Sequence, residues 1–149
     1  MIYGLRVEFD VGQNEKTEEL LLTINNLIRP KANICKLDCL DRIVKDFKTF
    51  ENAILTLDSI DQVTHRLIEA IISIRMRYYL YESEIQSINS YEDFINSRCV
   101  LLLLVNDVYY YDIYCKDERI MQNISEYIKK ELSISFKYID NYKEISSQM

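Results

Sequence analysis

The sequence predicts an α+β fold: a single domain over residues 1–149 with helices packed on a mostly antiparallel sheet of five or six strands. Length and composition indicate one domain, because 149 residues with a 48% hydrophobic content can bury a sizeable core. Two glycines and one proline leave little room for disorder. The third observation is periodicity, since some segments alternate apolar and polar residues and others repeat apolar residues at helical spacing.

Strand and helix patterns take turns in the first half of the chain. Residues 2–10 predict a strand, because apolar residues alternate there with charged ones. Leucines and isoleucines at helical spacing then predict a helix that ends at Pro30. The same patterns predict, in order, a helix at 37–47, a strand at 53–57 and a helix at 60–74 with Ser59 as its cap. Residues 76–86 could continue that helix, but their aromatic density favours a strand.

The second half is centred on a predicted hairpin. Residues 99–105 are apolar on both faces, which is typical of a central strand covered on both sides. Asn106 and Asp107 suit a tight turn, and the arm at 108–114 divides its tyrosines between the two faces. The other expected elements are a short helix opened by Ser90, a helix at 118–132 capped by Asp117, a strand at 134–140 and a frayed tail at 141–149.

The charge of the chain limits its partners. A net charge of −6 and a pI near 4.9 argue against nucleic-acid binding, which needs a basic surface, and permit a basic protein partner. The first residues lack the pattern of a signal peptide, and the longest uncharged apolar run, 99–105, is too short to cross a membrane. We therefore expect a cytoplasmic protein with no membrane partner.

Histidine and cysteine offer few catalytic or metal-binding candidates. His65 is the only histidine, and its polar neighbours favour a half-exposed helix residue over a member of a catalytic triad. Cys35 and Cys39 would share one face of the predicted helix, but no second cluster accompanies them, so we interpret them as buried thiols and expect no metal or cofactor. Cys99 and Cys115 flank the hairpin, where we expect them near each other and reduced.

Paired carboxylates are the next candidates. Glu82 and Glu84 would share one strand face, and Glu8 and Asp10 another. Paired carboxylates can perform acid–base chemistry, but each pair here alternates along a strand, which favours a solvated face. The two glycines form no phosphate-binding loop, which argues against the common modes of nucleotide binding.

Twelve tyrosines remain to be explained. Most fall on strands that we expect to be neighbours, and cross-strand packing accounts for them. One exposed row could instead form a contact surface, because tyrosine is favoured at protein interfaces. The residues of this hypothetical binding surface are Tyr110, Asp112 and Tyr114 on the second arm of the hairpin and Glu82 and Glu84 on a neighbouring strand.

Three segments carry a resemblance to a known family: SYEDFINSRCVLLLLVNDVYYYDIYCKDERI (90–120), KYID (137–140) and GLRVEF (4–9). They resemble an uncharacterised family of small proteins from Gram-positive bacteria, domain of unknown function 2691, chiefly in the C-terminal half of the chain. The resemblance implies an α+β domain without known activity, and it transfers no catalytic residue.

Two functions are compatible with these patterns. The first is a non-enzymatic, small acidic protein-binding module, immunity-like or regulatory, that contacts a basic protein partner. Acidity, tyrosine-rich strands and the lack of a catalytic motif favour it. The alternative is a small enzyme that uses a cysteine or carboxylate site in a cleft.

Overall fold

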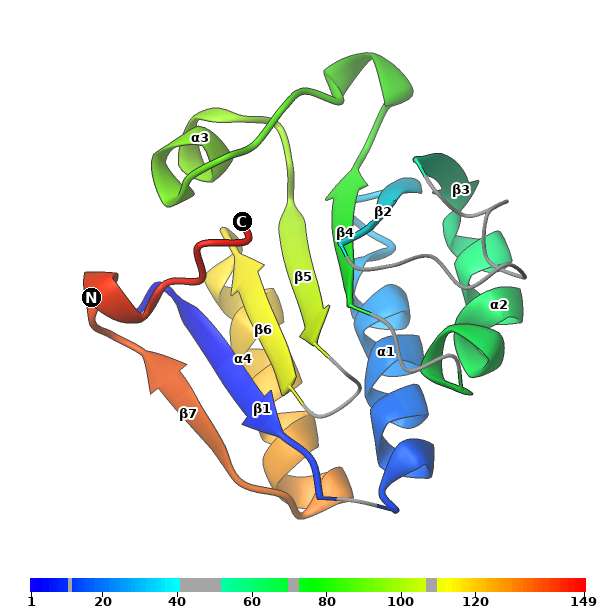
Figure 1. Cartoon of the computed structure of the whole chain (residues 1–149), viewed down its shortest axis with the longest axis vertical. Helices are drawn as coiled ribbons and strands as arrows, with labels where there is room; N and C mark the ends of the chain where they lie inside the picture. Colours follow the sequence, from blue (N-terminus) through cyan, green and yellow to red (C-terminus); the bar gives the residue numbers. More distant parts are fainter. Residues whose placement is uncertain (11, 41–51, 70–72, 107–109) are drawn as a thin grey trace.

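The computed structural model of the chain describes residues 1–10, 12–40, 52–69, 73–106 and 110–149. One antiparallel sheet with strand order β3-β2-β4-β5-β6-β1-β7 runs through the molecule (Figure 1). Its strands are β1 Gly4–Glu8, β2 Ile34–Cys39, β3 Ala53–Thr56, β4 Ile74–Tyr79, β5 Leu101–Asn106, β6 Tyr110–Cys115 and β7 Phe136–Ile139. The helices are α1 Asn14–Ile28, α2 Leu57–Glu69, α3 Tyr91–Asn96 and α4 Glu118–Tyr127, and the π-helical turn Ile128–Leu132 follows α4. The α+β class is therefore confirmed, with seven strands in the described part of the chain.

The predicted hairpin is confirmed as the pair β5 and β6. Leu101 lies opposite Cys115, and Asn106 lies opposite Tyr110. All five apolar residues of β5 are buried, as expected for a strand that is covered on both faces. Asn106 belongs to the strand and not to the turn, and residues 107–109, which hold the rest of the predicted turn, lie outside the described residues.

Helices α1, α2 and α4 cover one face of the sheet (Figure 1). The apolar repeat of the predicted helix at 118–132 faces inward there through Ile120, Ile124, Ile128 and Leu132. Asp117 caps this helix as predicted, since its carboxylate accepts a hydrogen bond from the Ile120 amide at 3.1 Å. Burial of each such aliphatic side chain contributes about 1.5–3 kcal/mol to folding.

A second, smaller apolar cluster covers the opposite face. It joins Phe94 of α3 to strand residues and to the C-terminal segment; its fully buried members are Tyr79, Ile88, Phe94, Cys99, Leu102, Leu104, Tyr114, Ile139 and Met149. The predicted cap of α3 is confirmed, because Ser90 Oγ accepts a hydrogen bond from the Asp93 amide at 3.1 Å. The sheet is therefore the middle layer of three, which explains why β5 has no polar face.

Residues 34–39 form strand β2, so the prediction of a helix from residue 37 is wrong in the described part of that segment. Cys35 and Leu37 are buried toward the three helices, and Lys36 and Asp38 lie on the other face, which is the two-residue period of a strand. Residues 41–47 lie outside the described residues. The added strand raises the count above the five or six that we expected.

Other boundaries differ from the predictions, and the helix expected at 60–74 does not reach Ile74, which is the first residue of β4. Helix α2 begins at Leu57 and not at residue 60, because Thr56 Oγ1 accepts a hydrogen bond from the Ser59 amide at 3.2 Å and takes the capping role expected of Ser59. Strand β4 ends at Tyr79, so residues 80–86 are not a strand, and Glu82–Glu84 form a single 3-10 turn.

The C-terminal segment packs against the sheet, although we expected a frayed tail at 141–149. Met149 is only 2% exposed, and its main-chain carbonyl oxygen accepts a hydrogen bond from Arg75 Nη1 at 2.8 Å. The Ser146 amide donates to the Tyr114 hydroxyl at 3.1 Å. A 3-10 turn at Tyr142–Glu144 lies between β7 and these contacts.

None of the helices that the structure describes has the length and apolar character that crossing a membrane requires.

Candidate functional site

Asp112, one of the predicted contact residues, lies in the interior. It is 3% exposed and lies directly opposite Arg6 in the β1–β6 pair. Arg6 donates to both carboxylate oxygens, through Nε at 2.7 Å and Nη2 at 2.9 Å, and Nη2 also donates to the Glu144 carbonyl at 3.0 Å. The hydrogen bond with Asp112 raises the pKa of Arg6 above its ordinary value. Asp112 is thus half of a bidentate cross-strand ion pair, and the expectation that it lies on an exposed surface is wrong.

The hairpin tyrosines that the structure describes, Tyr110, Tyr111 and Tyr114, divide between faces as predicted, but only one of these three is exposed. Tyr111 is buried under the helices, and its hydroxyl donates to the Thr17 carbonyl at 2.9 Å. Tyr114 is fully buried on the opposite face, where burial raises its pKa to about 12. Tyr110 is 42% exposed. Of the three hairpin residues proposed for binding, Tyr110 alone is accessible.

Glu82 and Glu84 do not join Tyr110 in one patch. They follow the end of β4 that lies beside Leu101, whereas Tyr110 lies beside Asn106 at the other end of β5. Leu101 and Asn106 are five residue steps apart along β5, a distance of about 17 Å. Glu84 accepts a hydrogen bond from the Tyr81 amide at 3.0 Å within its own turn. The structure therefore does not bring the five predicted binding residues together.

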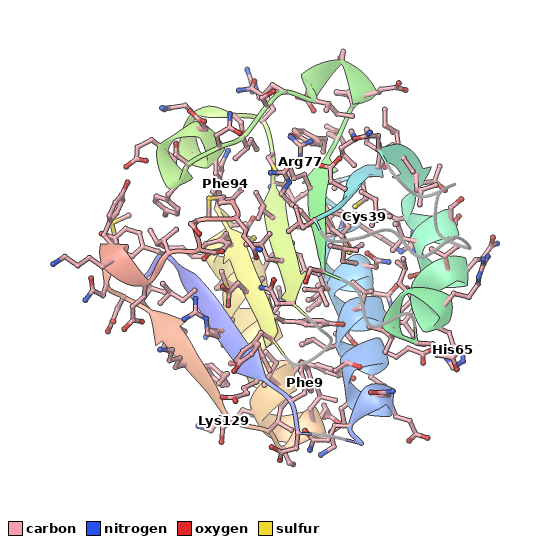
Figure 2. The ribbon with its side chains drawn as sticks, viewed as in Figure 1. Phe9, Cys39, His65, Arg77, Phe94 and Lys129 are labelled. Carbon is pink, nitrogen blue, oxygen red and sulfur yellow. The ribbon has the colours of Figure 1, made fainter. Side chains whose placement is uncertain are left out.

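His65 and the cysteines form no catalytic constellation in the part of the chain that the structure describes. Figure 2 shows His65 on the outer side of α2, where Nδ1 lies 2.9 Å from a Glu18 oxygen and Nε2 lies 2.8 Å from a Glu69 oxygen. These carboxylates raise the pKa of His65, with the hydrogen bond to Glu18 as the largest cause. Cys99 belongs to the apolar cluster on the α3 face of the sheet, whereas Cys115 packs against the cluster on the helical face, and both are free thiols.

A polar cluster on β2 and β4 was not predicted. Asp38 accepts hydrogen bonds from Lys36 at 2.8 Å and from Arg75 and Arg77 at 3.1 Å each. Burial alone would raise the pKa of Asp38, but the hydrogen bonds from Lys36 and Arg75 hold it below its ordinary value. Arg77, labelled in Figure 2, is 5% exposed and also donates to the Gln86 carbonyl at 2.5 Å. The cluster fastens the segment after β4 to the sheet, which is a structural role.

A cavity of about 800 Å³ lies between α3, α4, β7 and the first residues of the chain. We call it the apolar groove, after the side chains that dominate its lining: Met1, Ile2, Tyr91, Ile95, Met121 and Tyr138. Cys115 at the end of β6, Lys116 in the turn that follows and Glu118 at the start of α4 also line it. Its volume lies within the range of about 300–1,000 Å³ that is typical of ligand sites.

The apolar groove concentrates the exposed hydrophobic surface of the molecule. Eight large hydrophobic side chains are exposed in the described part of the chain, and four of them line this cavity: Met1 at 83%, Ile2 at 53%, Ile95 at 45% and Tyr138 at 43%. Scattered single exposures are ordinary, but a contiguous apolar surface commonly marks a binding site. The groove is therefore the candidate functional site.

Sequence reasoning missed the groove because its walls come from four separate segments. Ile95 follows the buried Phe94 on a helix of six residues, and Met121 stands beside the inward-facing Ile120. Either position reads as part of a core face. The sequence does show more apolar residues on these short elements than a core face needs. Only the topology shows that these residues line the same cavity.

Comparisons with known proteins agree with the resemblance in the sequence and extend it. The family model described as "Protein of unknown function (DUF2691)" matches residues 7–149, nearly the whole chain and not the C-terminal half alone. The chain is also 34% identical over 53 residues to "Uncharacterized protein YncE" of Bacillus subtilis (strain 168). That alignment covers 36% of this chain and 35% of the relative, so the chain spans about a third of the relative's length there. No solved structure matches the chain.

Proposed function

This chain belongs to the family of proteins of unknown function DUF2691, and from that premise we propose that it is a non-enzymatic protein-binding module that holds its partner in the apolar groove. The observation that carries the proposal is the gathering of Met1, Ile2, Ile95 and Tyr138 around one cavity. Removing such side chains from water supplies the main driving force of protein association.

The alternative of a small enzyme is less well supported, although Cys115 lines the groove. Burial raises the pKa of Cys115 to about 11 and that of Cys99 to about 12. Thiolates are the nucleophilic form of cysteine, and both thiols are protonated near neutral pH. Both ring nitrogens of His65 contact carboxylates, those of Glu18 and Glu69, so neither nitrogen is paired with Cys115 as a base.

A basic partner remains part of the proposal. The net charge of −6 attracts a basic surface over distances longer than a contact, which raises the association rate. The groove then supplies apolar contact area that slows dissociation. A cytoplasmic location is also proposed, because buried thiols such as Cys35 and Cys99 suit a reducing compartment.

Crosslinking of the tagged protein in its host, followed by mass spectrometry, tests the proposal. We compare the wild type with Ile95→Glu, which places a charge at the groove, and with Ile54→Glu as a matched control. Ile54 is 41% exposed, close to the 45% of Ile95, but it belongs to the edge strand β3. We expect a partner that the control retains and Ile95→Glu loses. A partner that both variants retain, or none with the wild type, would contradict the proposal.

A further inference from the structure

A second cavity adjoins the apolar groove and differs from it in charge. It has a volume of about 350 Å³, and its lining includes the cationic side chains of Lys31, Arg98 and Lys116 with Asp117 as the carboxylate. We call it the cationic pocket. Lys116 lines both cavities, so the turn from β6 into α4 forms their common wall.

The single carboxylate of the cationic pocket is already engaged. Asp117 accepts the capping hydrogen bond from the Ile120 amide at 3.1 Å, and its other oxygen lies 3.9 Å from Lys31 Nζ. Arg98 is exposed and makes no ion pair with any residue that the structure describes. Three cations face Asp117 in this pocket and Glu118 on the adjoining wall of the groove, which leaves a local surplus of positive charge in a chain whose net charge is −6.

Lys116 is held at the junction of the two cavities. Its Nζ donates to the Ser97 carbonyl at 2.5 Å and lies 4.9 Å from the centre of the Phe94 ring. An ammonium group has three donors, so it can bind a further acceptor. Burial, and then the nearby charge of Arg98, lower the pKa of Lys116, and an anion beside it would oppose that effect.

We propose that the apolar groove and the cationic pocket form one continuous site for a peptide segment of the partner in which apolar residues lie next to a carboxylate. The apolar residues occupy the groove against Ile95 and Tyr138, and the carboxylate binds Lys116 and Arg98. The argument for the carboxylate is charge complementarity: a purely apolar segment would leave Lys116 and Arg98 without an anionic partner. The inference rests on the proposed function and specifies the chemistry of the segment that the site holds. A partner with a basic surface overall can present such a segment locally.

Fluorescence anisotropy with two labelled peptides tests the inference. Both are capped at each end and carry three apolar residues, Leu-Phe-Leu, followed by Asp in one and by Asn in the other. Asp and Asn have nearly the same shape, so the pair isolates the charge. We expect the Asp peptide to bind the wild type about tenfold more tightly than the Asn peptide, as for a hydrogen-bonded charge.

Variants of the whole chain assign the contacts. Arg98→Gln and Lys116→Met should each reduce the preference for Asp to about threefold or less, because each removes one of the cations at the carboxylate. Ile95→Glu should abolish binding of both peptides. Lys129→Met is the matched control, since Lys129 is exposed in the turn after α4, and Figure 2 shows it at the far end of the sheet from Phe94. It should leave both affinities unchanged.

The failures are distinguishable. Equal affinity for the two peptides refutes the carboxylate and leaves groove binding intact, whereas no binding of either peptide refutes the whole inference and leaves the crosslinking experiment to decide the proposed function. If dodecanoate displaces the labelled Asp peptide at a lower concentration than the unlabelled Asp peptide does, the inferred peptide ligand is wrong and a fatty acid replaces it. Dimerisation of the wild type that Ile95→Glu abolishes overturns it in favour of a second copy of the chain.

Discussion

Replacing Asp112 by Asn is expected to destabilise the fold, because Asp112 holds the β1–β6 pair through a buried ion pair. Its side chain is 4% exposed, and that of Arg6 is 26% exposed. Asn keeps one acceptor oxygen for Arg6 but removes the negative charge. The guanidinium then remains largely covered beside a neutral amide.

The magnitude follows from these exposures. Removing one partner of a fully buried ion pair costs about 3–5 kcal/mol. Arg6 retains the Glu144 carbonyl and some contact with water, so we expect a smaller loss of about 2–3 kcal/mol in the free energy of unfolding. In a domain of this size that corresponds to a fall in Tm of about 4–12 °C.

Urea unfolding followed by circular dichroism measures the change. Glu8→Gln is the matched control, because Glu8 lies on the same strand pair opposite Tyr110 but is exposed. We expect the control to stay within about 0.5 kcal/mol of the wild type. An Asp112→Asn variant as stable as the control would refute the assignment of this pair as a main support of the sheet.

Three further predictions concern other buried or paired groups. Glu18 and Glu69 raise the pKa of His65 above its ordinary value of 6.5, so their interaction with the imidazolium stabilises the fold fully below pH 6.5 and is lost as the pH rises through the raised pKa. The Tm difference between the wild type and His65→Gln should therefore be larger at pH 5.5 than at pH 9. The reverse order would contradict the pairing. Arg77→Met should lower the free energy of unfolding by about 1–3 kcal/mol, because it removes one of three cations from Asp38, which keeps Lys36 and Arg75; urea unfolding that differs by less than about 0.5 kcal/mol would contradict this. Iodoacetamide at pH 8 should modify Cys99 and Cys115 far more slowly than free cysteine, since burial raises both pKa values, and mass spectrometry that finds either at the free rate would show an exposed thiolate.

Local patterns predicted the elements whose signals lie within a few residues of one another. The caps Ser90 and Asp117 mark helix starts because each hydroxyl or carboxylate accepts from an amide three residues later. The continuous apolar run of β5 indicates a strand with two covered faces, and both layers are present. The period of two at Cys35 and Leu37 was equally available, but the apolar residues that follow suggested helical spacing and concealed it.

Contacts between distant segments could not be predicted in the same way. Arg6 and Asp112 are 106 positions apart, and only the order of β1 beside β6 makes them partners. The exposed row of tyrosines was expected because alternation assigns faces, yet alternation does not show what covers each face. Here α3 and the C-terminal segment cover Tyr114 and exclude it from a binding surface.

The groove as a contact surface is tested most directly by amide NMR shifts of the ¹⁵N-labelled protein during titration with the crosslinked partner. We predict that the largest shifts occur at Ile2, Ile95, Met121 and Tyr138, which line the groove from four segments of the chain. Shifts confined to Tyr110 and the Glu82–Glu84 turn, with the groove residues unchanged, would contradict the proposed function.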